Sequence, residues 1–197
     1  DHSSPVIEPT KEIPFPVYSL GGGKWTTFRG FAESVADKIL PRLDAVRKVS
    51  SKNIPIGGGR NYPQSASDKR SWIEKLNKET GLTAERLGVL LERYGSGAAD
   101  VAKFIVSGED APFQHHTGYT RREIQYIIEN EAVCHVGDIV LRRTALALLG
   151  EVNKSLLEEL AQLAGASLNW TEAVCHEEAE GTADFLRKHH RIQITEN

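Results

Sequence analysis

The chain has 197 residues, of which 40% are hydrophobic and 26% are charged, and its formal net charge is −3. Such a chain is long enough for one domain with a real core, or for a domain with an appendage. Because acidic and basic residues are interspersed, nothing indicates a surface for nucleic acid or anionic membrane, and no apolar run approaches the ~20 residues of a membrane helix.

Cysteine and methionine usage indicates where the chain comes from. Cys134 and Cys175 are the only cysteines, which is too few for a disulfide framework and favours a reducing cytoplasm. The sequence contains no signal peptide and no methionine, and it starts with Asp1. We therefore expect a fragment of a longer chain or a processed product.

The first 45 residues predict a strand, a turn and a helix. Residues 1–13 contain two prolines and several polar side chains, so we expect extended chain or loop there. Residues 15–20 are apolar and aromatic, as in a short strand, and residues 28–40 have apolar side chains at helical spacing. Because a lone strand is unstable in water, we expect this arm to pack on the helical body or to pair with a second copy, which would give a homodimer.

Glycines connect the predicted strand to the predicted helix and are followed by polar residues, in the order Gly21, Gly22, Gly23, Lys24, Trp25, Thr26 and Thr27. Glycine lets the backbone turn sharply and lets a ligand approach closely. The first turn of the helix would add free N–H groups and the positive end of its dipole, and Lys24 would add a full charge. The stretch suits an anion-binding site, but a tight turn without any ligand has the same pattern.

Residues 46–64 are predicted to be a linker, because serine, asparagine, proline and glycine are concentrated there. The run Gly57-Gly58-Gly59-Arg60 superficially resembles a phosphate-binding loop. It lacks the Lys-Ser/Thr ending of a P-loop and a strand-to-helix setting, so we interpret it as linker.

Residues 65–197 are helical in pattern, with short loops and almost no alternating segments, which predicts a mainly α fold with a multi-helix bundle. Thr83, Thr120, Asn153 and Asn169 are the expected helix caps, and Thr120 with Glu123 fits a capping box. The predicted helical stretches are residues 68–78, 83–94, 98–106, 120–132, 138–149, 153–163 and 169–186.

Two Cys-His pairs, at residues 134–135 and 175–176, do not predict a metal site. Neighbouring residues on a helix point about 100° apart, so both members of one pair rarely face one ion. We interpret both cysteines as small core residues. His115 and His116 fall in a predicted loop with no orienting partner nearby in sequence, which favours a surface position. No residue is assigned as catalytic, and no metal is expected.

Arg142 and Arg143 lie between apolar residues, so one of them should face the core and need a carboxylate. Glu131 is the first candidate and Glu129 the second. We predict a partly buried ion pair that fixes two helices; binding of a phosphate by the two arginines is the alternative.

Two motifs carry a resemblance to a known family. Residues 22–29, Gly-Gly-Lys-Trp-Thr-Thr-Phe-Arg, closely resemble the GGKWTTYR signature of FAD-dependent glycerol-3-phosphate dehydrogenases, with Phe28 in place of the usual tyrosine. Residues 119–149, with the run Leu141-Arg142-Arg143-Thr144, resemble the helix pair of the same family. Asp1-His2 looks like the end of the RDH motif of that family. The motifs occur in the family's order and cover most of the chain.

The resemblance implies that residues 1–45 end an FAD-binding domain, residues 46–64 are a linker and residues 65–197 form the helical C-terminal domain. It implies a parent enzyme that oxidises sn-glycerol 3-phosphate to dihydroxyacetone phosphate and passes electrons through FAD to a quinone, peripherally at the inner face of the membrane. Gly22, Gly23, Lys24 and the two threonines would line flavin and substrate, with Trp25 among them.

The chain contains no GxGxxG, so we expect this fragment to bind no FAD and to be inactive by itself. An oxygen-using oxidase would carry much the same motif and is an alternative. A second hypothesis, of another class, is that residues 65–197 are a non-catalytic scaffold or interaction domain.

Overall fold

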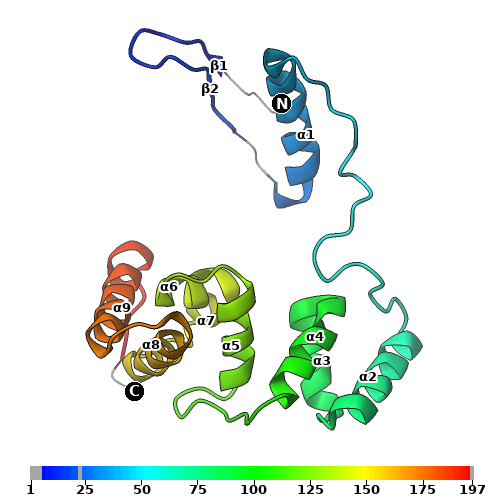
Figure 1. Ribbon diagram of the computed structural model, residues 1–197, viewed down its shortest axis with the longest axis vertical. Coiled ribbons are helices and arrows are strands. Elements are labelled where there is room, and N and C mark those ends of the chain that lie inside the picture. The colour runs from blue at the N-terminus through cyan, green and yellow to red at the C-terminus, as the bar shows by residue number, and fades with distance from the viewer. Residues whose placement is uncertain (1–5, 22–23, 196–197) are drawn as a thin grey trace. The chain divides into compact units, whose positions relative to one another are not determined.

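The structure is a computed structural model that describes residues 6–21 and 24–195. The chain divides into two compact units, Asp1–Ile56 and Gly57–Asn197, each of which is described by itself (Figure 1). We call them the N-terminal unit and the helical unit. The boundary between them falls within the predicted linker, residues 46–64. The fold is mainly α, as predicted from the sequence, and its only sheet in the described residues has two short strands.

The N-terminal unit begins with an antiparallel pair of strands. Strand β1, Val6–Ile7, pairs with β2, Val17–Tyr18, so that Val6 lies opposite Tyr18 and Ile7 opposite Val17. Part of the strand predicted at residues 15–20 is therefore present, and its pairing partner is in the same chain. Val6 and Ile7 lie in the stretch predicted to be extended chain or loop; they are extended and form a short paired strand.

The rest of this unit is a single helix with a short turn at each end. The 3-10 turn η1, Trp25–Thr27, leads into α1, Phe28–Ile39, which continues into η2, Leu40–Leu43. Val35 is the one buried hydrophobic side chain among the described residues of the unit. Large apolar side chains such as Phe15, Leu20 and Phe28 are more than half exposed. The unit thus has almost no core of its own.

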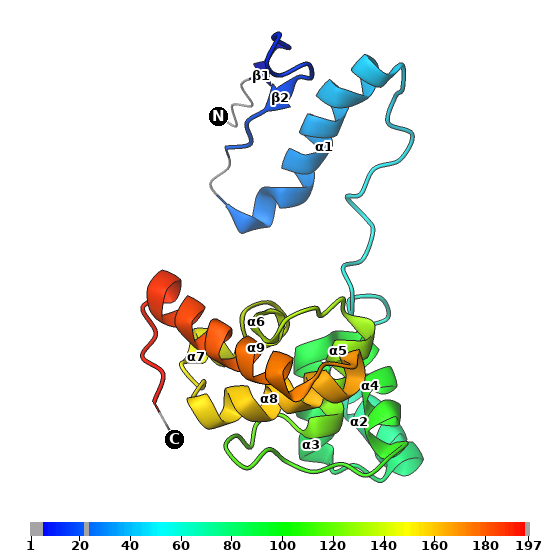
Figure 2. The same ribbon diagram turned by 60° about the vertical axis from the view of Figure 1, so that its left-hand side comes forward.

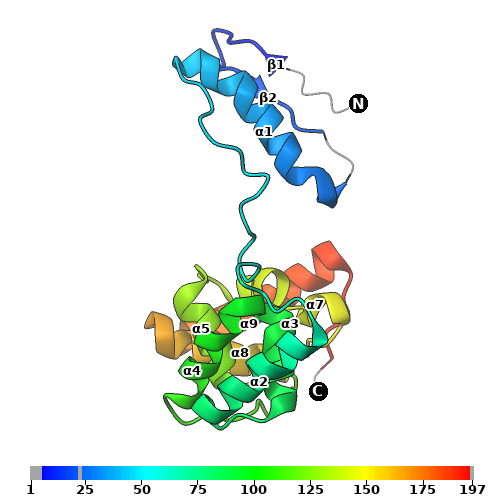
Figure 3. The same cartoon turned by 90° about the vertical axis from the view of Figure 1, so that its right-hand side faces the viewer.

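The first half of the helical unit packs three helices around one apolar cluster. These are α2, Ala66–Thr80, α3, Ala84–Tyr94, and α4, Ala98–Val106, with the 3-10 turn η3, Gly95–Gly97, between the last two (Figure 3). Ser65 and Thr83 cap α2 and α3 by accepting hydrogen bonds from backbone N–H groups of the first turn. The buried cluster consists of Leu76, Leu87, Leu90, Ala98, Val101, Ala102 and Ile105.

The second half of the helical unit forms a larger cluster. Its elements are α5, Arg121–Asn130, α6, Val136–Asp138, the π-helical turn η4, Ile139–Arg143, α7, Leu146–Leu149, α8, Lys154–Leu168, α9, Glu172–Phe185, and the π-helical turn η5, Leu186–His190. Helices α8 and α9 pack side by side, and α5 packs on α8 (Figure 2). Leu156, Leu157 and Leu160 of α8 are fully buried at the centre of this cluster.

The structure corrects three details of the predicted helices. Ala132 lies beyond the end of α5 with a positive φ of 52°, so it does not continue that helix. Residues 138–149 are not one helix, because Thr144 is extended and separates η4 from α7; Leu149 is consequently 63% exposed. Asn169 does not cap α9: it ends α8 in a left-handed conformation, and Thr171 caps α9 instead.

Two glycines bring separate backbone segments of the helical unit into contact. Gly58 and Gly95 both have positive φ, and a Cβ built on either would overlap the backbone of the segment that carries the other. The carbonyl oxygen of Gly58 accepts hydrogen bonds from the backbone N–H of Ser96 at 2.8 Å and from its hydroxyl at 3.2 Å. Gly58 therefore packs against the end of α3, in a run that the sequence indicated only as linker.

A fully buried carboxylate, that of Glu123 on α5, connects the two apolar clusters. Its oxygens accept hydrogen bonds from Arg86 at 2.5 Å, from Arg93 at 3.0 Å and from the Tyr94 hydroxyl at 2.7 Å. The capping box predicted for Thr120 is thus only half right. Thr120 Oγ1 accepts a hydrogen bond from the Glu123 N–H at 3.4 Å, but the Glu123 side chain points into the interior.

Within residues 6–21 and 24–195, no helix is both long enough and apolar enough to cross a bilayer. The same residues contain no group of three or more histidine, cysteine, aspartate or glutamate side chains that could hold a metal ion.

Candidate functional site

The glycine turn that the sequence singles out is described from Lys24 onward, since Gly22 and Gly23 lie outside the described residues. Lys24 is exposed, and its carbonyl oxygen accepts hydrogen bonds from Thr27, from the backbone N–H at 3.2 Å and from the hydroxyl at 3.0 Å. These bonds close η1, which also contains Trp25, whose side chain is not described, and the exposed Thr26. The turn therefore sets Lys24 directly before η1, which leads into α1.

A hollow of about 810 Å³ lies beside the start of α1 within the N-terminal unit. Thr26, Thr27 and Gly30 line it together with three cationic side chains, Arg29, Lys38 and Lys52, and one carboxylate, Glu33. Two of the residues singled out from sequence, Thr26 and Thr27, thus share one hollow. Lys24 lies next to them in the chain but does not line it.

Hydrogen bonds fix the charged groups around this hollow. The Arg29 guanidinium donates to the carbonyl oxygens of Ser51, at 2.7 Å, and Ile54. Glu33 accepts hydrogen bonds from the backbone N–H of Ser51 and from its hydroxyl, and these lower the pKa of the carboxyl. Arg47 lies 3.2 Å from the other carboxylate oxygen. These hydrogen bonds hold the segment that follows α1 against the side of that helix.

This donor set fits an anionic group. The Glu33 charge is offset by Arg47 and by serine donors, whereas Lys38 and Lys52 form no ion pair among the described residues. Hydroxyls, free ammonium groups and a helix N-terminus are the groups that bind phosphates and other anions. The N-terminal unit could hold the edge of a phosphate-bearing cofactor or substrate. The sequence lacks the GxGxxG that would hold a whole dinucleotide.

The two arginines of η4 take different partners. Arg143 Nε lies 3.9 Å from Glu131 Oε2, and the two side chains are 36% and 34% exposed. Arg142 instead pairs with Asp138 on its own helical stretch, at 2.7 Å, and is 63% exposed. Only Arg143 is therefore brought to Glu131, at the long limit of an ion pair.

The structure supplies a partner for His115 that the sequence did not reveal. His115 Nδ1 lies 2.7 Å from Oε1 of Glu159, on α8, and Glu159 also accepts hydrogen bonds from the backbone N–H groups of Gln114 and His115. Forty-four residues separate the two side chains, so no local pattern indicates the pair. His116 is half-buried, which corrects its predicted surface position.

One of the two cysteine predictions is wrong. Cys175 is buried on α9 as expected, but Cys134 is exposed, because the chain leaves α5 before reaching it. Asp138 accepts hydrogen bonds from the backbone N–H groups of Cys134 and His135, both at 2.9 Å, and so holds this turn at the start of α6.

Comparison with known proteins assigns most of the chain to one family. A sequence model of the family described as "C-terminal domain of alpha-glycerophosphate oxidase" matches residues 49–175. Mitochondrial glycerol-3-phosphate dehydrogenase of Rattus norvegicus is 31% identical over 179 residues, which cover 85% of this chain and 23% of the relative. Alpha-glycerophosphate oxidase of Streptococcus pneumoniae is 27% identical over 163 residues, covering 78% of this chain and 26% of the relative.

The fold and these matches first define the class of protein: a mainly helical C-terminal domain of the alpha-glycerophosphate oxidase kind. The chain belongs to the family of C-terminal domains of alpha-glycerophosphate oxidase. It spans about a quarter of the length of the curated relatives that it matches.

Proposed function

We propose that this chain is the C-terminal part of an FAD-dependent glycerol-3-phosphate dehydrogenase that oxidises sn-glycerol 3-phosphate to dihydroxyacetone phosphate. The observation that carries the proposal is the pairing of the GGKWTTFR turn with a helical unit that matches the oxidase family. When bound, FAD would supply the acceptor for the hydride of substrate C2, the proton of the C2 hydroxyl would go to a base that this chain does not supply, and a quinone would take the electrons.

In this proposal the N-terminal unit supplies binding and electrostatics. Lys24, placed by η1 just before α1, would hold an anionic oxygen of substrate or cofactor as a point charge. Thr26 would add a hydroxyl donor from the adjoining hollow, and Thr27, whose hydroxyl donates to the Lys24 carbonyl, would hold the turn, with Gly22, Gly23 and Trp25 completing it. A charge set in place before the reaction stabilises developing negative charge without reorganisation.

The helical unit would act as a scaffold. Its buried groups are apolar clusters and an ion-pair network around Glu123, which are features of stability rather than of chemistry. Deleting residues 65–197 from the longer protein should lower its stability but leave turnover per folded molecule unchanged. A large fall in kcat with the fold intact would assign a chemical role to the helices instead.

The electron acceptor separates the two enzyme types among the relatives. We favour a dehydrogenase that passes electrons to a quinone, with the longer protein in the cytoplasm and peripheral at the inner face of the membrane; an oxidase that uses oxygen is the alternative. A homodimer through the N-terminal arm also remains a proposal, although β2 already pairs with β1 of its own chain.

The experiment is an assay of the longer protein with sn-glycerol 3-phosphate and two acceptors. Reduction of a soluble quinone, with little hydrogen peroxide formed in air, is the expected result. Stoichiometric hydrogen peroxide in air would identify an oxidase. Absence of oxidation with either acceptor, in a preparation that contains flavin, would contradict the proposed activity.

A further inference from the structure

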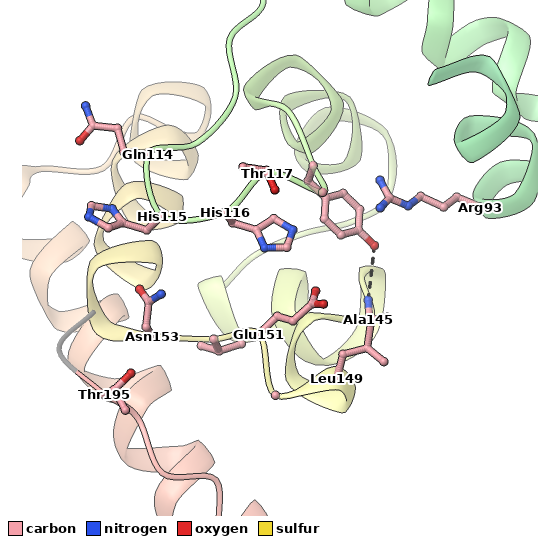
Figure 4. Close-up of a pocket in the computed structure, with 14 residues that line it drawn as sticks. Arg93, Gln114, His115, His116, Thr117, Ala145, Leu149, Glu151, Asn153 and Thr195 are labelled. Atoms are coloured by element: carbon pink, nitrogen blue, oxygen red, sulfur yellow. Dashed lines mark hydrogen bonds between the residues drawn. The ribbon is translucent and has the colours of Figure 1, made fainter. Parts of the chain in front are cut away.

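A cleft of about 910 Å³ in the helical unit is lined by none of the residues that the proposed function assigns to cofactor or substrate (Figure 4). It lies between residues 114–119, which connect α4 to α5, and residues 149–153, which lead into α8, and Thr195 borders it near the C-terminal end. We call it the histidine cleft, because His115 and His116 both line it. Its volume is within the range of small-molecule sites.

His116 lines this cleft and has one polar atom without a partner in the described residues. Its ring stacks on Tyr119, with centroids 5.7 Å apart, and its Nε2 is buried without any hydrogen-bond partner in the described residues. Burial lowers the pKa of His116, an effect that Arg93 strengthens and that Glu151 and Glu123 oppose. The imidazole is therefore neutral near pH 7 and can exchange a hydrogen bond with a hydroxyl group.

His115 is oriented by a carboxylate. Since Nδ1 lies 2.7 Å from Glu159, which also accepts two backbone N–H groups of the same loop, Nε2 is the nitrogen left for a ligand. Burial opposes ionisation of Glu159, but its hydrogen bonds with His115 and these N–H groups outweigh burial and lower the pKa of its carboxyl. The loop is thus held rigidly at one wall of the cleft.

The opposite wall contributes Glu151 and Asn153. In Figure 4 both side chains rise from the segment before α8 toward the histidine loop. The Glu151 carboxylate forms no hydrogen bond or ion pair in the described residues, and the Glu151 backbone N–H donates to the Leu146 carbonyl at 2.9 Å. Asn153 Oδ1 accepts from the Leu156 N–H at 2.8 Å, which leaves its amide N–H groups as donors. The cleft therefore combines a free carboxylate acceptor with amide donors.

The charges of the cleft argue against an anionic ligand. The Arg93 guanidinium is already paired with Glu123 at 3.0 Å and lies 3.7 Å from the centre of the Tyr119 ring. Glu151 adds a negative charge that repels phosphates and carboxylates. The Gln114 and Asn153 amides and the Thr117 hydroxyl, which also line the cleft, carry no charge.

We propose that the histidine cleft binds a neutral polyhydroxylated molecule, a sugar or sugar alcohol, through Glu151, Asn153 and His116. The carboxylate would accept hydrogen bonds from ligand hydroxyls, and the amide would donate to their oxygens. His116 Nε2 would gain the partner that it lacks. This inference is independent of the proposed function, whose substrate is an anion bound by the other unit.

The test is titration of the 197-residue chain with sorbitol and D-glucose, followed by backbone amide NMR. Saturable shifts of residues 114–119 and 149–153 are expected with at least one of the two compounds. Shifts that do not saturate, shifts spread over the whole surface, or tighter binding of glycerol 3-phosphate at the same residues would overturn the proposal.

Two variants in the cleft and one control variant test which side chains bind the ligand. Glu151→Gln keeps the shape but removes the charged acceptor and should weaken binding about tenfold. His116→Phe keeps the stacking on Tyr119 and removes Nε2, and it should also weaken binding. Glu158→Gln, an exposed position on α8 away from the cleft, makes the same charge change and should bind as the parent chain does. Unchanged affinity in both cleft variants, with native-like spectra, would contradict the assignment.

Discussion

Glu123 is the residue whose environment most constrains the helical unit. Its carboxylate is fully buried, and Arg86, Arg93 and Tyr94, all on α3, surround it. A buried ion pair stabilises little compared with a well-packed apolar group, but removing one partner leaves the other charge uncompensated. The ion pairs of Glu123 therefore fix which faces of α3 and α5 meet, and removing the carboxylate should destabilise the folded unit.

We predict that Glu123→Ala lowers the free energy of unfolding by about 3–5 kcal/mol, because two arginines lose their buried counter-charge. Urea unfolding followed by circular dichroism measures this. Glu92→Ala, at an exposed position on α3, is the control and should change stability by less than about 0.5 kcal/mol. A Glu123 variant as stable as the control would show that the network contributes nothing.

The sequence predicted part of this arrangement and missed the rest for a physical reason. Thr120 followed by Glu123 has the spacing of a capping box, and Thr120 does cap α5. The destination of the Glu123 side chain depends on arginines 30 and 37 residues earlier in the chain. Pairs that tertiary packing creates, such as His115 with Glu159, leave no periodic signal.

His135 gives the unit a pH dependence near neutrality, opposite in sign to that of His116, whose pKa is lowered. Its Nδ1 lies 2.8 Å from Glu178, on α9, and the hydrogen bond and charge of Glu178 raise the pKa of His135. A pKa that is raised in the folded state means that the His135–Glu178 pair stabilises the fold fully below about pH 6.5, the ordinary pKa of histidine. This stabilisation is lost as the pH rises through the pKa of His135 in the folded state.

We therefore predict that the unfolding free energy falls between pH 5.5 and pH 8.5 by a term that His135→Gln removes. The side chain is 69% exposed, so solvent screening limits the term to about 1 kcal/mol. His176→Gln, an exposed position on α9, should retain the pH dependence. The same curve for the parent chain and the His135 variant would rule the pair out.

At the scale of elements, the end of α3 depends on glycine. Gly95 has a positive φ of 58° and meets the backbone of Gly58, so the chain entering α2 and the chain leaving α3 touch without side chains between them. The sequence showed that Gly95 ends a helix. It did not show that Gly58 packs against that end, because a glycine-rich run has the same composition in a linker and in a close backbone contact.

Gly95→Ala should destabilise the unit by roughly 1–3 kcal/mol or more, since a Cβ there overlaps the Gly58 carbonyl and φ is unfavourable. Gly88→Ala is the matched control: it lies in the middle of α3, and a Cβ there meets nothing within 4 Å. The control should be stabilised by about 0.5–1 kcal/mol. Thermal unfolding of both variants compares them directly, and equal midpoints would contradict the close contact.

The interrupted stretch between α6 and α7 shows the limit of periodicity at this scale. Apolar residues from Ile139 to Leu149 fit one helix in sequence, yet η4 has π-helical hydrogen bonds and Thr144 is extended. The Thr144 backbone N–H donates to the Ile139 carbonyl at 3.0 Å, and its hydroxyl donates to the same oxygen at 2.8 Å. A threonine that closes a helical turn in this way is not distinguished from one inside a helix by its sequence.

For the whole molecule, composition and patterning predicted a mainly α fold, which the structure confirms. The family followed from two motifs, and the comparisons show it. From its residues, the glycine turn could be predicted to bind an anion. Which anion it binds could not be predicted, because in the proposed function other residues hold most of the ligand. The two units also differ in their cores. The helical unit has two apolar clusters, whereas the N-terminal unit buries one apolar side chain among its described residues.

The 197-residue chain should be colourless and inactive when purified alone. It has no GxGxxG, and its N-terminal unit has a hollow lined by threonines and lysines that suits the edge of an anionic group. The absorbance spectrum between 350 and 500 nm, taken after incubation with FAD and removal of free cofactor, is the measurement. A retained flavin band would mean that the binding site is contained in this chain.

The most direct test of the account is the kinetics of Lys24 variants in the longer protein. Lys24→Ala should lower kcat/KM for sn-glycerol 3-phosphate by about ten- to a hundredfold, because a charge-assisted contact to an anion is lost. Lys48→Ala, an exposed lysine of the same unit that does not line the hollow, should leave kcat/KM unchanged. Unchanged kcat/KM in a folded, flavin-loaded Lys24→Ala enzyme would contradict the central claim that this turn places a lysine at an anionic ligand.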